Sequence, residues 1–188
     1  MVLERLAEYE AGLFSRIIKI YFPFLCLSLI AFAIINSMVA FVIALIFIVL
    51  QVIICEINYF SGEEFFINKL KLDIAPFAAI FLGYYFSFFA GFIGMIIPLL
   101  IQDIDRETSK FTELEDIFFN SIVALAAYVF RSVPFLPLAI ALIVLRLVGL
   151  LISHLVLLGE LNPRKFLSEG SSAFILLAVM GGLLRIFG

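Results

Sequence analysis

Arg146 is the residue whose type and position most clearly indicate chemistry. It lies in the middle of an apolar run, from about Leu138 to Leu158, that is long enough to cross a bilayer. An arginine at the centre of a membrane helix costs about 2.5–3.5 kcal/mol on insertion scales, so its guanidinium needs polar partners. On a helix, Ser153 shares the face of Arg146 and His154 lies at the edge of that face. This face is therefore expected to point into a helical bundle.

Polar partners for Arg146 are expected from other apolar segments. Gln51, and Tyr84 or Tyr85, could hydrogen-bond the guanidinium, and no acidic residue is expected at the same depth. A small anionic ligand, such as a carboxylate, a phosphate or a lipid head group, could then bind Arg146. The structural alternative is that carbonyls and hydroxyls satisfy the side chain, or that it snorkels. The candidate ligand-binding residues are Arg146, Ser153, His154, Gln51, Tyr84 and Ser87.

Small residues recur at strict four-residue spacing in the segment expected to form the third span. They are Ala75, Ala79, Gly83, Ser87 and Gly91. On one helix these residues stack on a single face and let another backbone approach closely. The pattern predicts helix packing inside the bundle, self-association or binding of another membrane subunit. A solute path along the same groove is the alternative.

An ion pair is expected between Glu56 and Arg131. These residues lie near the ends of the second and fourth spans, and six spans place both ends on the cytoplasmic side. A salt bridge there would close one end of the bundle. Proton or ion coupling by Glu56 is the alternative.

Enzymatic and metal chemistry lack their usual residues. His154 is the single histidine, so neither bis-histidine haem nor a multi-histidine metal site can form within one chain. The chain has no HExxH, GxSG, GxGD or Walker-type glycine loop. Cys26 and Cys55 lie in apolar stretches without a CxxC arrangement. We expect no metal and no cofactor, and an enzyme is not favoured.

Composition defines the class of protein. Of 188 residues, 65% are hydrophobic and 14% charged, and the mean hydropathy is +1.24. A soluble domain is about 45–50% apolar, so the sequence predicts an all-α, polytopic transmembrane helical bundle. We expect residues 1–188 to form one integral membrane domain in the lipid bilayer, without a soluble domain. Basic residues are scattered singly, which argues against nucleic acid as a partner.

About six spans are predicted. They cover approximately residues 17–35, 38–57, 74–102, a helix beginning near 113 and ending at 132–137, then 138–158 and 171–187. A short interfacial helix is expected over 63–73, and Gly159 is expected to end the fifth span. If the segment with Pro134 and Pro137 is a kink within one element, the number of spans is five.

Lysine and arginine positions predict the orientation, because basic residues stay on the cytoplasmic side. Six spans put seven basic residues on one side, with both termini, and four on the other. The N-terminus is therefore predicted to be cytoplasmic, and so is the C-terminus. With five spans, the C-terminus would lie on the opposite side of the membrane from the N-terminus.

A family resemblance accompanies the second half of the chain. From Phe111 to Phe187, a polar loop, a span with Ala127-Tyr128 and then Ser132-Val133-Pro134, and two further spans resemble Yip1-type membrane proteins. The resemblance implies a role in membrane organisation or trafficking. Two functions are thus carried forward. One is a small transporter or channel component that binds a small polar or anionic solute, and the other is a membrane scaffold or complex subunit.

Overall fold

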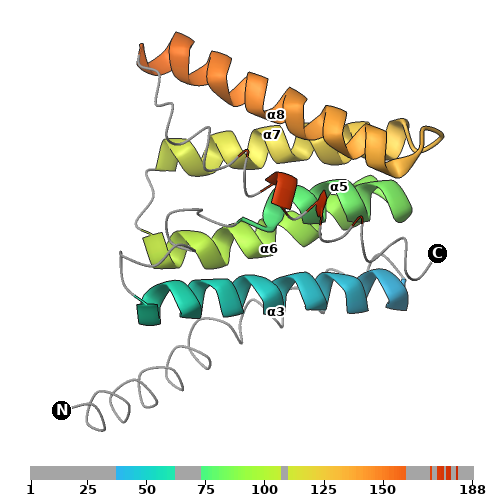
Figure 1. Cartoon of the computed structure of the whole chain (residues 1–188), viewed down its shortest axis with the longest axis horizontal. Coiled ribbons are helices and arrows are strands. Elements are labelled where there is room, and N and C mark those ends of the chain that lie inside the picture. Colours follow the sequence, from blue (N-terminus) through green and yellow to red (C-terminus); the bar gives the residue numbers. More distant parts are fainter. Residues whose placement is uncertain are drawn as a thin grey trace, which may run out of the picture.

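The computed structural model describes residues 37–61, 73–106, 110–159 and the positions 170, 173–175, 177, 178 and 181. Within these ranges the chain is helical with no strand (Figure 1), so the prediction of an all-α protein is confirmed. The expected span at 17–35, the interfacial helix at 63–73 and most of 171–187 lie outside the described residues.

Two long apolar helices form the outer parts of the bundle. Helix α3 covers Met38–Ser61 and begins where the hydroxyl of Ser37 accepts the Ala40 N–H at 3.3 Å. Helix α8 covers Phe135–Leu158 and ends at Gly159, whose left-handed φ of 67° confirms the predicted stop. Within the described ranges, these are the two helices long and apolar enough to cross a membrane, over Met38–Cys55 and Phe135–Leu157.

The prediction of one long third span is wrong. The chain forms α5, Ala75–Tyr85, and α6, Phe88–Arg106, separated at Phe86 and Ser87. The hydroxyl of Ser87 accepts the N–H of Ala90 at 3.1 Å, so Ser87 caps a new helix. A Cβ added at Gly91 would lie 2.6 Å from the Ala79 carbonyl oxygen. Gly91 therefore lets α6 fold back closely on α5.

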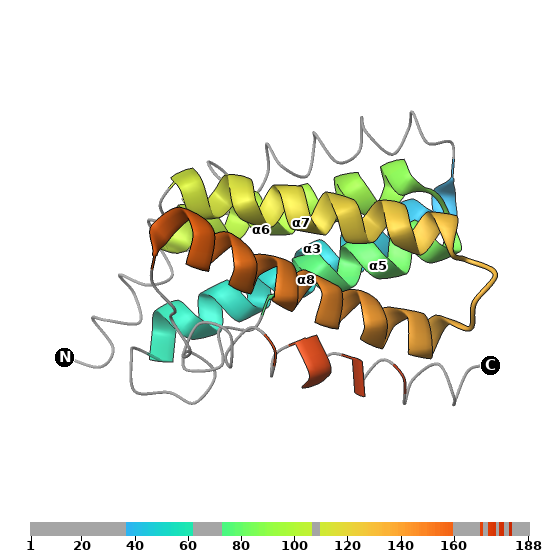
Figure 2. The same ribbon diagram turned by 90° about the horizontal axis from the view of Figure 1, so that it is seen from above.

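The helices alternate in direction around one end of the bundle, here called the turn end. It contains the start of α3, the α5–α6 turn and residues 130–134, which join α7, Lys110–Val129, to α8. Helices α3, α6 and α8 run away from the turn end, while α5 and α7 run toward it (Figures 1 and 2). The Tyr84 hydroxyl donates to the Val133 carbonyl at 2.8 Å, which joins two turns at this end.

Helix α5 is about half as long as its neighbours. Its 11 residues span about 16 Å, whereas the 24 residues of α3 span about 36 Å. Edge-to-face contacts of Phe47 on α3 with Phe77 and Phe81 hold α5 beside the half of α3 that is nearer the turn end. The N-terminus of α5 consequently lies in the middle of the bundle.

The distribution of polarity is opposite to that of a water-soluble protein. Large apolar side chains are exposed on the outer helices, for example Val42, Ile46 and Ile53 on α3, Phe118 and Leu125 on α7, and Val144, Val148, Ile152 and Val156 on α8. The interior, in contrast, contains Gln51, Asp73, Glu115, Asn120, Arg146 and His154. An apolar exterior around buried charges is the arrangement expected for helices solvated by lipid.

Candidate functional site: a polar layer in the middle of the bundle

Seven polar side chains, here called the polar layer, extend from the middle of the bundle toward the end that lies opposite the turn end. They are Gln51 on α3, Asp73 just before α5, Glu115, Asp116 and Asn120 on α7, and Arg146 and His154 on α8. Gln51 lies about 20 Å along α3 from Met38, and Arg146 about 17 Å along α8 from Phe135. The start of α5 lies about 16 Å from the turn end, and therefore at the same level.

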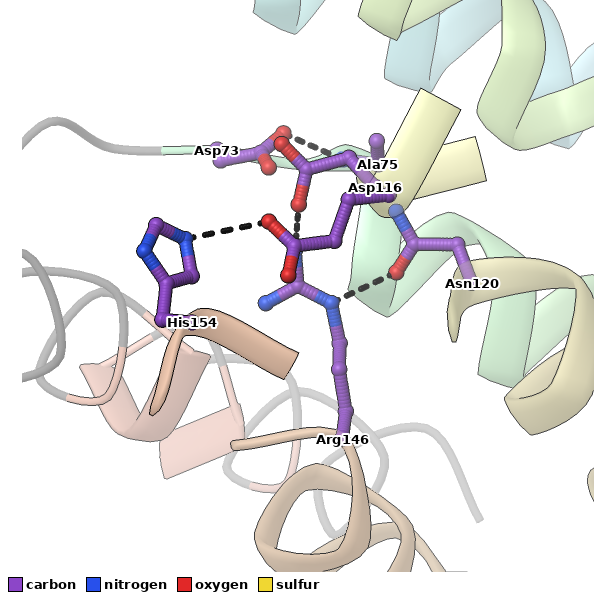
Figure 3. A network of polar contacts seen from close by, with 7 residues as sticks. Asp73, Ala75, Asp116, Asn120, Arg146 and His154 are labelled. Atoms are coloured by element: carbon purple, nitrogen blue, oxygen red, sulfur yellow. Dashed lines mark hydrogen bonds and ion pairs between the residues drawn. The ribbon is translucent and has the colours of Figure 1, made fainter. Parts of the chain in front are cut away.

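Arg146 is bound by two side chains of α7. Its Nε–H donates to Oδ1 of Asn120 and its Nη2 to Oδ1 of Asp116, each at 2.8 Å (Figure 3). The arginine is 3% exposed. The expectation that no acidic residue lies at the depth of Arg146 is therefore wrong. Asp116 and Asn120 are one turn apart on α7, and the turn at 130–134 brings that face of α7 against α8.

His154 contacts a second carboxylate of α7. Its Nε2 lies 3.0 Å from Oε2 of Glu115, and both side chains are buried. The contact has the distance of an ion pair but not the alignment of a hydrogen bond. It carries opposite charges when the imidazole is protonated. Two carboxylates, a guanidinium and an imidazole thus join α7 to α8.

The start of α5 is closed by polar side chains. The Ile74 N–H donates to Oε1 of Gln51 at 3.2 Å, and the Ala75 N–H donates to Oδ1 of Asp73 at 2.9 Å. Pro76 follows and has no N–H. Helix N-termini commonly bind anions through such free N–H groups. Here protein oxygens already occupy the donors of Ile74 and Ala75.

The remaining predicted ligand-binding residues are spread over the bundle. Gln51 is fully buried in the interior, but its amide oxygen binds the start of α5. Tyr84 binds Val133 at the turn end, and Ser87 caps α6, so both lie on the half of the bundle away from Asp116. Ser153 is partly buried on α8, next to His154 in the sequence. Of the predicted set, Arg146, His154 and Gln51 belong to the polar layer, and each has a different partner.

Four of the five small residues are buried within the chain, and Ser87 is partly buried. Ala75 and Ala79 are fully buried on α5. A Cβ added at Gly83 would lie 2.7 Å from the Ala124 carbonyl oxygen of α7, and Gly91 lies against α5. The five residues therefore belong to two helices and a turn. A partner helix could reach the Ala75–Gly91 face only if α6 or α7 moved away.

The structure does not support the expected ion pair between Glu56 and Arg131. Position 56 is about 27 Å along α3 from Met38, whereas Arg131 lies at the turn end. The guanidinium of Arg131 lies 5.1 Å from the ring centroid of Tyr128. The error has a topological cause, because the break at Phe86 and Ser87 adds a reversal of the chain between α3 and α7.

Four members of the polar layer were missed as site residues: Asp73, Glu115, Asp116 and Asn120. For Asp116 and Asn120 the sequence contains a signal, an acidic residue and an asparagine four positions apart on a predicted helix. No group of three histidine, cysteine or carboxylate side chains placed to hold a metal ion occurs in the described ranges.

Comparison of the chain with protein-family models, with curated proteins and with solved structures gave no match. The resemblance to Yip1-type proteins therefore rests only on the residues quoted for it above.

Proposed function

We propose that this protein is a multi-pass integral membrane protein, a small transport or channel component that binds a small polar solute at the polar layer. The apolar exterior of α3, α7 and α8 supports the bilayer location. The proposal keeps six full crossings: α3, α6, α7, α8 and the expected spans at 17–35 and 171–187. Helix α5 is an additional, broken crossing.

The observation that carries the transport proposal is that α5 starts at the level of the buried ion pair. Asp73 and Ile74, at the start of α5, lie at the depth of Arg146 and Asp116. Discontinuous helices that end near the bilayer midplane, beside buried charges, are a recurring form of solute site in transporters.

The charges of the layer favour a neutral or cationic solute over an anionic one. Three carboxylates, those of Asp73, Glu115 and Asp116, accompany one guanidinium and one imidazole among the described residues. An anion bound here would be repelled by these carboxylates at close range. The two N–H groups at the start of α5 could not offset this repulsion, because they already bond Gln51 and Asp73. The sequence predicted a small polar or anionic solute, and we therefore keep a polar solute that is neutral or cationic and no longer propose an anionic one.

The same topology supports a revised orientation. Arg131 lies at the turn end, while Arg106 and Lys110 lie at the opposite end of the bundle. The segments that follow α3 and α8 continue from that opposite end and contain Lys69 and Lys71, and Arg164 and Lys165. These six basic residues at the opposite end, against Arg131 at the turn end, favour a cytoplasmic location for the opposite end. The N-terminus stays cytoplasmic and the C-terminus moves to the outer side.

The scaffold alternative is less well supported, because it requires the Ala75–Gly91 face to be accessible to a partner helix. The Ala75–Gly91 face is covered by helices of the same chain.

Native mass spectrometry of the protein extracted in mild detergent tests the proposal. We expect a retained small molecule without net negative charge that is lost in Asn120→Leu. It should be kept in Ser121→Ala, whose hydroxyl bonds only within α7 in the described contacts. A retained protein chain without a small molecule, unchanged in both variants, would favour the scaffold.

A further inference from the structure

Asn120 presents a buried donor that the polar layer does not use. Its side chain is fully buried, and its Oδ1 accepts the N–H of Arg146. A guanidinium can only donate, so this bond identifies the oxygen of the amide and leaves Nδ2 on the other side. Nδ2 has no hydrogen-bond partner among the described residues. Native proteins seldom leave a buried N–H group without a hydrogen-bond acceptor. The side chain of Asn120 therefore indicates that an acceptor binds at Nδ2.

The unmet donor faces the first turns of α5. Helices α5 and α7 run in the same direction and touch at Gly83 and Ala124. One turn back along each helix brings Ala79 to the level of Asn120, and two turns back bring Ala75 to the level of Asp116. Figure 3 shows the amide nitrogen of Asn120 on the side of Ala75. Alanine side chains cannot accept a hydrogen bond, so the acceptor must come from elsewhere.

The surroundings restrict what that acceptor can be. The carboxylate of Asp116 lies one turn from Asn120, held by the same guanidinium. A carboxylate or phosphate ligand would add an uncompensated negative charge beside the neutral Asp116–Arg146 pair, and an ammonium group or metal ion could not accept from Nδ2. A hydroxyl oxygen can accept from Nδ2 and donate to Asp116, because an ionised carboxylate has about four acceptor sites.

We infer that a hydroxyl oxygen, of water or of a small polyol, binds between Nδ2 of Asn120 and the carboxylate of Asp116, beside the first turns of α5. The polyol form rests on the proposed transport function, whereas the water form does not. In the polyol form, Asn120 is the residue that selects neutral hydroxylated molecules.

Nuclear magnetic resonance of the side-chain amides tests this site directly. The chain has five asparagines, so ¹⁵N-asparagine labelling in lipid nanodiscs gives five NH₂ pairs. Replacing Asn36, Asn58, Asn68 and Asn162 by aspartate leaves Asn120 as the remaining signal without changing Asn120 itself. The four substitutions can also be made singly, so that assignment does not depend on the quadruple variant.

Three outcomes are informative. A water cross-peak to the Asn120 NH₂ protons that survives added glycerol supports bound water. A cross-peak that glycerol displaces, with a shift of the amide signal, supports a polyol. The absence of both a water cross-peak and a glycerol-induced shift would overturn the inference. Ser121→Ala should leave the signal unchanged. Bound water without any retained solute in mass spectrometry would support this site while contradicting the transport proposal.

Discussion

Arg146 and Asp116 join α8 to α7 through a 2.8 Å contact between Nη2 and Oδ1, with the arginine 3% exposed. Asn120 adds a second bond to the same guanidinium. The pair therefore neutralises the single arginine of the mostly apolar helix α8, and it is formed by two helices that follow each other directly in the chain.

Removing one partner of this pair should lower the free energy of unfolding by more than replacing both partners with apolar residues does. Asp116→Ala leaves a buried guanidinium without its carboxylate, and we expect the free energy of unfolding to fall by about 3–5 kcal/mol. The double variant Asp116→Leu/Arg146→Met should recover most of that loss. Unfolding in sodium dodecyl sulfate followed by circular dichroism measures both. Additive losses would contradict a coupled pair.

Gly91→Ala should separate α5 from α6. The new Cβ would lie 2.6 Å from the Ala79 carbonyl oxygen and 2.9 Å from the Gly83 nitrogen, and backbone atoms cannot yield as a side chain can. We expect a loss of about 1–3 kcal/mol in the same unfolding assay. Gly181→Ala is the matched control, because among the described residues its Cβ would meet the Leu136 side chain at an ordinary contact distance of 3.5 Å. Equal effects at the two positions would argue against the close hairpin.

Ser87→Ala should weaken the start of α6 by about 1 kcal/mol, since it removes a helix N-cap. Ser121→Ala should change stability by less than about 0.5 kcal/mol, because that hydroxyl bonds the Ile117 carbonyl within its own helix. Thermal unfolding of the two variants side by side measures the difference. If Ser87 lay on a continuous helix face, the two losses would be alike.

Single cysteines should report the orientation of the bundle. In a cysteine-free variant, a membrane-impermeant maleimide applied to intact cells should label Ser132→Cys, at the turn end, and should not label Ser109→Cys, between α6 and α7. Permeabilised cells should label both positions. The reverse pattern would invert the orientation, and equal labelling in intact cells would contradict the bilayer arrangement.

Hydrophobicity and stop signals predicted much of the fold. The beginning of α3 at Met38 and the end of α8 at Gly159 agree with the structure, because long apolar runs and a glycine C-cap are local signals. The break at Ser87 was not predicted. Four-residue spacing through Gly83, Ser87 and Gly91 is the same for a continuous helix and for a hairpin whose two arms face each other.

The candidate site was predicted only in part, for a related reason. Arg146 is conspicuous because a charge in an apolar run is rare, and this property requires no tertiary information. Its partner Asp116 lies in the acidic stretch before an apolar segment, where acidic residues usually begin a helix in water. Only the registration of α7 against α8 places Asp116 at the depth of Arg146, and a one-dimensional pattern does not contain that registration.

The order of α7 and α8 in the chain bears on biogenesis. Asp116 and Asn120 are synthesised before Arg146. The oxygens that accept from the guanidinium are therefore present when α8 leaves the ribosome. In the proposed membrane arrangement, helices α7 and α8, joined by the short turn at 130–134, would enter the bilayer as one hairpin with the charge of Arg146 already neutralised. Insertion of α8 into the bilayer would then depend on α7. A truncated chain that begins at Phe135 would insert poorly.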